Sequence, residues 1–247
     1  MPTFPENESV LFKRGTQWHR GRVTAVVGRS RRVVTPSGKR HTVAVGDLRP
    51  ARDRVLILET RLDRNLKKSK RIYGPMMQQW LQAMNVDVLY ERVHTLDDLR
   101  QFLRVEGKNV ATRVIHFMGH GRKDLGKGNV SLLLTFGKIN LGDPEHLEIF
   151  RGLKDKILLF SCCEAGADPQ AMEAVRNASG AAAVIAYRKE IYDWYTNLAE
   201  GMLYERLMHS RLKPKTIVKR VIAAMEQLGI RLEGMDAVAR KPVLVCF

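Results

Sequence analysis

Two apolar runs that each lead into a reactive side chain beside glycine constrain the fold of this chain most. The runs are residues 112–118 and 156–160, and they lead into Gly119-His120-Gly121 and into Ser161-Cys162-Cys163-Glu164-Ala165-Gly166. Short apolar runs of this kind are typical of parallel strands that are buried on both faces. Parallel strands bring their carboxyl ends to one edge of a sheet. The sequence therefore predicts that His120 and Cys163 meet at such an edge.

The apolar periodicity alternates between strand-like and helix-like segments from residue 51 onward. We expect strands at 54–59, 86–90, 112–118, 156–160, 181–186 and 241–247, helices at 72–84, 95–104, 144–153, 169–178, 192–208 and 214–228, and a hairpin at 130–141. This alternation predicts an α/β fold with a mostly parallel six-stranded sheet and helices on both faces.

The first fifty residues follow a different pattern. Residues 8–50 hold four or five short β-like runs, which are separated by turns rich in glycine and proline. So short a sheet needs closure to protect its edges, which predicts a small all-β barrel in a domain of residues 1–50 before an α/β domain of residues 51–247. Its motifs, Val10-Leu-Phe-Lys, Trp18-His-Arg-Gly-Arg-Val23 and Val45-Gly-Asp-Leu-Arg-Pro50, resemble those of SH3-like and Tudor-like barrels. Trp18 is either a partner-binding aromatic residue or a core residue.

Positive charge is concentrated in the N-terminal segment. The net charge is +16, and residues 1–50 hold ten Lys and Arg against three Asp and Glu, a balance of +7. Further basic runs are Arg61–Arg71 and Arg211–Arg220. The excess favours an acidic partner, either nucleic acid or an acidic protein surface. The alternative is a solvated basic surface without a dedicated ligand.

Composition argues against several other classes of protein. The three cysteines are an odd number and two are adjacent, so the pattern indicates a reducing compartment rather than a disulfide framework. No spacing of ligand residues suggests a metal site, and we expect no cofactor. No apolar run approaches the roughly 20 residues of a membrane span, and no secretory signal is evident, so we expect a cytoplasmic protein.

Cysteine and histidine at neighbouring strand ends suggest nucleophilic catalysis. A free thiol is mostly protonated at neutral pH, and a nearby histidine can remove its proton. We therefore predict Cys163 as the nucleophile and His120 as the base. The flanking glycines permit close approach of a substrate, and the amides of Gly121 and Cys163 are candidates for an oxyanion hole. The alternative is an inert, buried cysteine, which fits Cys162 better because neighbours on a strand face opposite sides.

The same residues resemble a known family. Gly119-His120-Gly121 and Cys163-Glu164-Ala165-Gly166 are similar to the motifs of caspase-like cysteine peptidases of clan CD, and most of all to the CHAT group. Residues 180–186 and Asp193-Trp-Tyr-Thr196 are similar to the strand and helix start that follow in that group, so the resemblance covers roughly residues 53–247. One departure is Lys189, which stands where the family usually has an aromatic residue.

The resemblance implies a caspase-like cysteine endopeptidase that cleaves a protein substrate, and a role as a regulated protease of a bacterial immunity or cell-death module. It places the first substrate pocket beside Ser161 and the segment that contains Glu190 and Asp193. A buried acid at Asp193 would favour Arg or Lys in the substrate, and the alternative is that Asp193 caps the following helix. A second function also stays open: a catalytically silent caspase-like module that binds nucleic acid or an acidic protein through its basic barrel.

Overall fold

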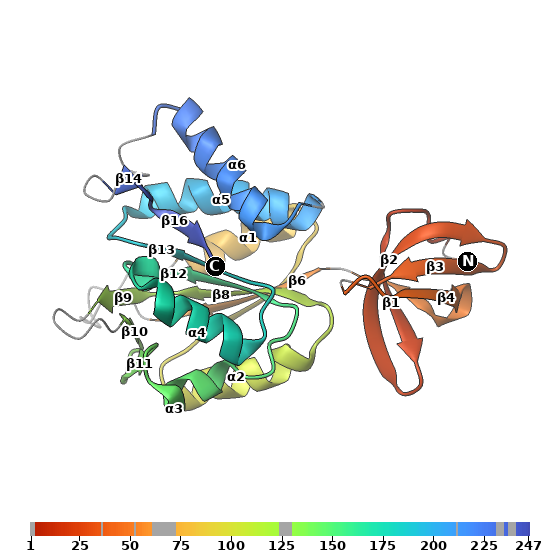
Figure 1. Ribbon diagram of the computed structural model, residues 1–247, viewed down its shortest axis with the longest axis horizontal. Coiled ribbons are helices and arrows are strands. Elements are labelled where there is room, and N and C mark those ends of the chain that lie inside the picture. Colours follow the sequence, from red (N-terminus) through yellow and green to blue (C-terminus); the bar gives the residue numbers. More distant parts are fainter. Residues whose placement is uncertain are drawn as a thin grey trace.

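The protein is a mixed α/β protein with a central six-stranded sheet and a separate antiparallel sheet at its N-terminus (Figure 1). The computed structural model describes residues 3–35, 37–51, 53–60, 73–123, 130–210, 212–230, 235–236 and 241–247. The basic run at residues 61–71 lies outside these ranges, as does Arg211 of the other run. Within them, no helix is long and apolar enough to cross a membrane.

The N-terminal sheet is entirely antiparallel. Its strands are β1 (Ser9–Arg14), β2 (Gln17–Val27), β3 (Ser30–Val34), β4 (Arg40–Ala44) and β5 (Leu48–Pro50), in the order β4-β3-β2-β1-β5. Alternating residues of these strands form a small core of Phe4, Val10, Phe12, Val23, Val33, Val43 and Leu48. The predicted strands of this segment are therefore confirmed. Its assignment as an SH3-like or Tudor-like barrel stays a prediction.

The central sheet combines five parallel strands with one antiparallel strand. Its strands are β6 (Arg54–Glu59), β7 (Asp87–Arg92), β8 (Thr112–Met118), β12 (Ile157–Ser161), β13 (Ala183–Tyr187) and β16 (Leu244–Cys246), in the order β16-β13-β12-β8-β6-β7. Only β16 runs antiparallel to its neighbour, β13. The predicted last strand at 241–247 is divided, because β15 (Lys241–Pro242) pairs with β14 (Met235–Asp236) instead of joining the central sheet.

Helices cover both faces of the central sheet, as the alternation predicts. Figure 1 shows α1 (Gly74–Ala83), α5 (Asp193–His209) and α6 (Pro214–Gln227) over one face, and α2 (Leu96–Lys108), α3 (Pro144–Leu147) and α4 (Pro169–Ser179) over the other. Each face has its own apolar core, and successive residues of β6 alternate between the two: Leu56 and Leu58 lie in one, and Val55 and Ile57 in the other. The central strands are thus buried on both sides, which accounts for their continuous apolar sequence.

A small three-stranded sheet stands at the carboxyl ends of β8 and β12. The predicted hairpin forms β10 (Val130–Leu133) and β11 (Lys138–Asn140), and β10 also pairs with β9 (His120–Lys123). Sequence analysis did not predict β9, because glycines and basic residues there are typical of a loop. This added strand fixes the backbone on both sides of Gly121.

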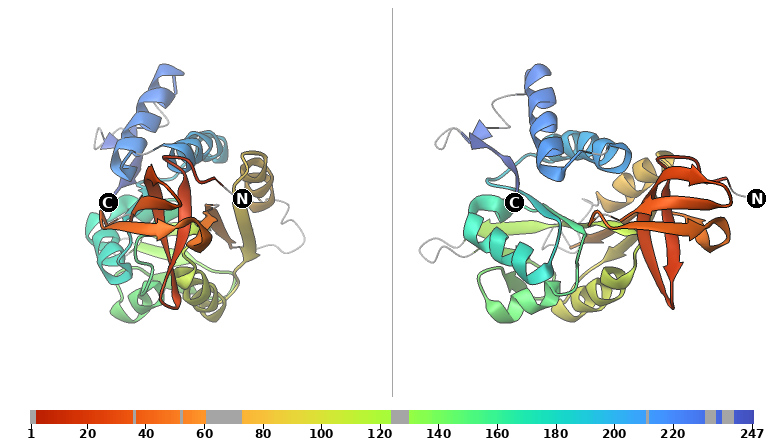
Figure 2. Two further views of the ribbon diagram at one scale, coloured as in Figure 1. Left: turned by 90° about the vertical axis from the view of Figure 1, so that its right-hand side faces the viewer. Right: turned by 45° about the vertical axis from the view of Figure 1, so that its right-hand side comes forward.

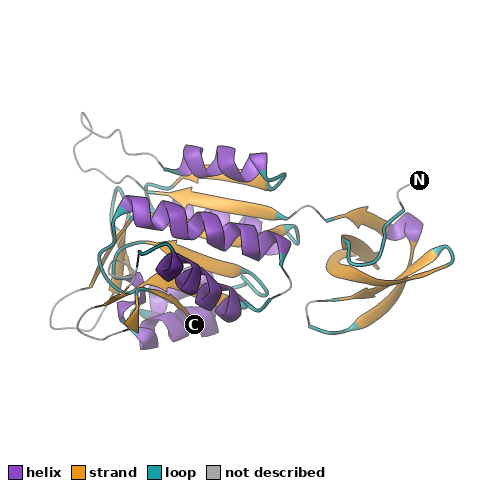
Figure 3. Ribbon diagram, turned by 90° about the horizontal axis from the view of Figure 1, so that it is seen from above, coloured by secondary structure: helices purple, strands orange, loops and turns teal. Residues whose placement is uncertain are grey.

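The N-terminal sheet lies beside the opposite end of the central sheet. Figures 2 and 3 show it joined to the α/β part by a single chain segment, next to the end at which β6 begins. Arg20 of β2 donates a hydrogen bond to the carbonyl of Ala111 (3.3 Å) and forms an ion pair with Asp53. The N-terminal sheet is therefore separated from the edge where β8 and β12 end by the length of these strands.

Candidate active site

The register of β8 and β12 brings His120 and Cys163 to the same edge. Met118 and Ser161 are the last paired residues of the two strands, and the amide of Gly119 donates to the carbonyl of Ser161 (3.2 Å). His120 and Cys163 each follow two residues after this pair. Both line one cavity of about 370 Å³. The parallel pairing of two buried strands is thus the cause of their proximity.

The chain turns sharply directly after Cys163. Glu164 has a φ of 58°, in the left-handed region, which costs a residue other than glycine roughly 1 kcal/mol or more. Its carboxylate accepts a hydrogen bond from the amide of Lys123 (3.0 Å), so the turn is tied to β9. This bond helps hold Glu164 in its unfavourable conformation and keeps β9 beside the cysteine.

Gly121 allows β9 to approach the cysteine turn closely. A Cβ atom at Gly121 would lie 2.1 Å from the carbonyl oxygen of Cys163 and 3.0 Å from Cβ of Cys162. Gly119 is similarly confined, since a Cβ atom there would lie 2.2 Å from Oγ1 of Thr60. The backbone of Gly121 therefore lies directly beside Cys163, and the role of the two amides as an oxyanion hole stays a prediction.

The two adjacent cysteines have different surroundings. Cys162 is buried within the apolar core beneath α4, and its sulfur is 3.9 Å from the carbonyl oxygen of Phe117. Burial raises the pKa of the Cys162 thiol well above its usual value. Cys163 is only half-buried and lines the cavity. Cys163 is the cysteine within reach of a substrate.

The surroundings of Cys163 favour the protonated thiol. Burial raises the pKa of Cys163, an amide hydrogen bond from Ile191 lowers it, and the negative charges of Glu190, Asp193 and Glu164 raise it further. The net pKa is above the ordinary value, so little thiolate is present at neutral pH. A reaction at Cys163 therefore needs a group that removes the proton as the bond forms, and His120 lines the same cavity.

The three predicted pocket residues occupy different positions. Ser161 lines the cavity and is half-buried, whereas Asp193 lines it from an exposed position. Asp193 is the first residue of α5, and the N-cap of this helix is Tyr192, which makes no side-chain capping bond. The carboxylate of Asp193 accepts a hydrogen bond from the hydroxyl of Tyr73 (2.5 Å). Glu190 is exposed and does not line the cavity.

A buried carboxylate that was not among the predicted site residues, Glu200, also lines the cavity. Its Oε1 accepts hydrogen bonds from Ser161 and from the hydroxyl of Tyr187 (3.1 Å). Burial raises the pKa of Glu200 to about 7, although both hydrogen bonds lower it. The sequence signal is that Glu200 falls within the apolar stripe of α5, among Ala199, Leu203, Tyr204 and Leu207, where a carboxylate is out of place.

His116 of β8 completes a buried network with Glu200. Its Nε2 is 2.5 Å from Oγ of Ser161 and its Nδ1 is 2.8 Å from the hydroxyl of Tyr204. Burial lowers the pKa of His116 to about 3, so its ring is neutral at physiological pH. His116 does not line the cavity. His116 is therefore a core histidine whose two ring nitrogens are both hydrogen-bonded.

In the part of the chain that the structure describes, no group of three or more His, Cys, Asp and Glu side chains is placed to hold a metal ion.

Comparison with known proteins gives no family for this chain. No model of a protein family matches the sequence, and no curated protein matches it.

Proposed function

We propose that the chain is a cysteine endopeptidase of the caspase-like type, closest to the CHAT group, with residues 51–247 as its peptidase domain. The observation that carries this proposal is that Cys163 and His120 follow two neighbouring parallel strands and line one cavity. The mixed sheet with helices on both faces supports the proposal, because it gives a nucleophile and a base the same exposed edge. A regulated protease of a bacterial immunity or cell-death module, acting on one protein in the cytoplasm, is the biological role that the motifs suggest.

The proposed reaction proceeds through a thioester. His120 accepts the thiol proton as the sulfur of Cys163 attacks the carbonyl carbon of the scissile bond. The amides of Gly121 and Cys163 stabilise the oxyanion that forms. His120 then gives the proton to the leaving amine, the C–N bond breaks, and a water molecule hydrolyses the thioester to regenerate the thiol.

Covalent labelling tests this proposal. A peptide carrying a thiol-reactive group in place of the scissile bond should label the wild type once, at Cys163, as read by intact mass and peptide mapping. Cys163→Ala should not be labelled, whereas Cys162→Ala should be, because Cys162 lies in the core. Labelling of Cys162 in the Cys163→Ala protein, at the wild-type rate, would contradict the assignment.

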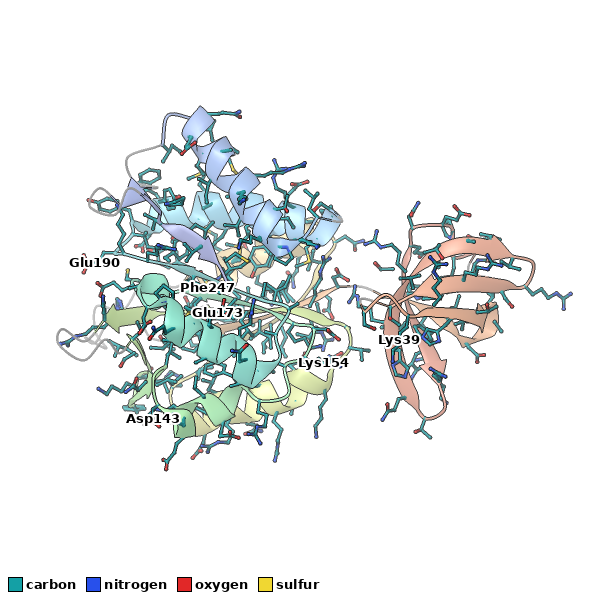
Figure 4. The ribbon with its side chains drawn as sticks, viewed as in Figure 1. Lys39, Asp143, Lys154, Glu173, Glu190 and Phe247 are labelled. Carbon is teal, nitrogen blue, oxygen red and sulfur yellow. The ribbon has the colours of Figure 1, made fainter. Side chains whose placement is uncertain are left out.

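A second candidate function, binding of nucleic acid, is favoured by a basic cleft between the N-terminal sheet and the α/β part. The cleft has a volume of about 410 Å³. Its cationic lining comes from both parts of the chain: Arg14, Arg20 and Lys39 from the first, and Arg113, Lys154 and Lys156 from the second. Figure 4 labels Lys39 and Lys154 on the two sides of the junction. Trp18, which the apolar core of the sheet does not include, lines the cleft as well.

Positive charges in this cleft repel one another. Burial and then the charges of Arg113 and Arg22 lower the pKa of Arg20 to about 10. Burial and the charge of Arg20 lower the pKa of Lys156 to about 8, against the opposite effect of Glu106 and Asp155. Arg20 and Arg113 share one carboxylate, Asp53. A phosphate backbone would relieve this repulsion.

The basic segment is not wholly available for binding. Arg31, one of the ten Lys and Arg of residues 1–50, is buried, and its guanidinium donates to the backbone carbonyls of Phe4 (2.7 Å) and Ser30 (2.8 Å). The guanidinium of Arg31 therefore stabilises the backbone of the N-terminal segment instead of facing a partner. Of the basic residues in this segment that line the cleft, Arg14 and Lys39 are exposed.

Salt dependence tests this second function. The double variant Lys39→Glu and Lys154→Glu should weaken binding of a duplex oligonucleotide and lower the log–log slope against salt by about two, since each lysine neutralises about one phosphate. The double variant Lys215→Glu and Lys219→Glu, at exposed sites on α6 outside the cleft, makes the same change in charge and is the matched control, which should change both quantities less. Fluorescence anisotropy over a salt series measures both. Equal slopes for the cleft double variant and the wild type would remove the cleft from consideration.

A further inference from the structure

The wall of the candidate active-site cavity contains a carboxylate that is fully buried. Glu200 has no exposed surface, and its Oε2 has no hydrogen-bond partner within the described residues, although Nε2 of His116 is 3.5 Å away. Leaving a buried carboxylate oxygen without a donor costs about 1–3 kcal/mol or more. An unsatisfied acceptor beside a cavity that holds a candidate nucleophile is an indication of a ligand that supplies the donor.

The hydrogen bonds of the surrounding network form chains of donors that end at Glu200. The hydroxyl of Ser161 donates to Oε1 of Glu200, so the short contact between Ser161 and His116 requires Nε2 of His116 to be the donor. The ring is neutral and has a single N–H, so Nδ1 accepts from the hydroxyl of Tyr204. Tyr187 also donates to Oε1. The chain of donors ends at one carboxylate, an arrangement that stabilises its ionised form.

The same proton arrangement determines what this network offers the cavity. The proton of Ser161 is committed to Glu200, so the only hydrogen-bonding capacity that this hydroxyl has left for the cavity is a lone pair. Ser161 and Glu200 thus present acceptors and negative charge, and Asp193 adds another carboxylate at an exposed part of the same cavity. A group rich in N–H donors and positively charged is complementary to this lining.

We propose that Glu200, together with Ser161, makes this cavity the binding site for a Lys or Arg side chain of the substrate, directly preceding the bond that Cys163 attacks. This inference rests on the proposed peptidase function, whose substrate class it names. A cavity of about 370 Å³ is large enough for one long side chain. Glu200, and not only the exposed Asp193, is then the residue that determines specificity.

Substrate binding in this pocket has a consequence for the nucleophile. The charges of Glu190, Asp193 and Glu164 raise the pKa of Cys163 in the free protein. A cationic side chain bound beside Cys163 offsets these negative charges and lowers the barrier to forming the thiolate. Basic substrates should therefore have a higher kcat as well as a lower KM.

Two measurements test the proposal, and the first does not require catalysis. Butylguanidinium, which mimics the arginine side chain, should bind the wild type, as measured by isothermal titration calorimetry. Glu200→Gln should weaken this binding about tenfold or more, because it removes the charge and keeps the shape and the acceptor for Ser161 and Tyr187. Glu205→Gln, an exposed site on the same helix, is the matched control and should bind as the wild type does.

The second measurement compares matched peptides with Lys or Met before the scissile bond. The wild type should prefer Lys by about 10²-fold in kcat/KM, and Glu200→Gln should reduce this ratio about tenfold or more while still cleaving the Met peptide. The thermal unfolding midpoint of Glu200→Gln checks that the fold is intact, and Glu200→Asp, which restores the charge, should recover part of the preference.

The preference should also depend on pH. The titratable groups that face Glu200 are His116 of β8, Cys162 after β12, Tyr187 of β13 and Tyr204 of its own helix, with Cys163, His120, Tyr73 and Asp193 around the cavity. Burial raises the pKa of Glu200 to about 7, so the carboxylate gains its charge as pH rises through neutrality. Butylguanidinium binding should tighten between about pH 6 and about pH 8 in the wild type and not in Glu200→Gln.

The outcomes separate this proposal from the proposed function. Binding of butylguanidinium that is unchanged in Glu200→Gln but lost in Asp193→Asn would overturn the role of Glu200. A wild type with equal kcat/KM for the Met peptide and the Lys peptide would overturn the preference and leave the peptidase intact. Absence of both cleavage and covalent labelling at Cys163, together with Glu200-dependent binding, would instead refute the peptidase and keep the cation site.

Discussion

Replacement of Cys163 by alanine is expected to lower peptide-bond cleavage by about 10⁴-fold or more, since removal of a covalent nucleophile removes the reaction path itself. His120→Ala should have an effect of similar size, and the double variant should lose little more than either single variant, because a nucleophile and its base act as a unit. Progress curves with a peptide substrate, corrected for background hydrolysis, measure all three.

The neighbouring cysteine provides the matched control for this prediction. Cys162→Ala removes a sulfur from the core, which should cost at most about 2 kcal/mol of unfolding free energy and leave turnover within about threefold of the wild type. A folded Cys162→Ala protein without activity, beside a Cys163→Ala protein that still cleaves, would reverse the assignment of the nucleophile.

Gly121→Ala should have the second largest effect. The added Cβ atom would lie 2.1 Å from the carbonyl oxygen of Cys163, so β9 and the cysteine turn must separate. Misplacement of a reacting group by about 1 Å can lower the rate about 10²-fold. We expect a loss of that size in kcat/KM, with a decrease of about 1–3 kcal/mol in unfolding free energy. Chemical denaturation and steady-state kinetics give the two values separately.

The control for Gly121 is a glycine with free space. Gly46 lies in the N-terminal part. Apart from its neighbours in the chain, no heavy atom lies within 4 Å of the position that a Cβ atom would take there, and its φ is not positive. Gly46→Ala should therefore leave cleavage and stability nearly unchanged. If Gly121→Ala behaved in the same way, the close contact between β9 and Cys163 would have no importance for the site.

Much of the fold follows from the sequence because its strands are buried on both faces. Continuous apolar runs predicted β6, β8 and β12 to within one residue. The pairing of β9 with β10 could not be predicted, since His120-Gly121-Arg122-Lys123 has no apolar alternation and its strand is stabilised by its neighbour. The division of the last strand between two sheets could not be predicted either, because β15 likewise depends on its pairing with a neighbour, β14.

The candidate site was predictable only where it lies at strand ends. Cys163 and His120 follow directly from the two apolar runs, whereas Glu200 comes from a helix that is distant in sequence and lies beneath the cavity. A single carboxylate within an apolar stripe indicates burial but not its neighbours. The hydrogen bonds that Glu200 accepts from Ser161 and Tyr187 depend on how α5 packs on β12 and β13, which no local pattern shows.

The acidic surroundings of Cys163 also determine how the free protein responds to oxidants. Peroxide oxidises the thiolate and not the thiol, and the pKa of Cys163 is raised by burial and by Glu190, Asp193 and Glu164. Without a bound cation, the sulfur of Cys163 is therefore oxidised only slowly to sulfenic acid. Cys162 is buried in the apolar core and is not accessible to the oxidant. The same charges that disfavour the thiolate of the proposed nucleophile therefore also protect its sulfur from oxidation in the free protein.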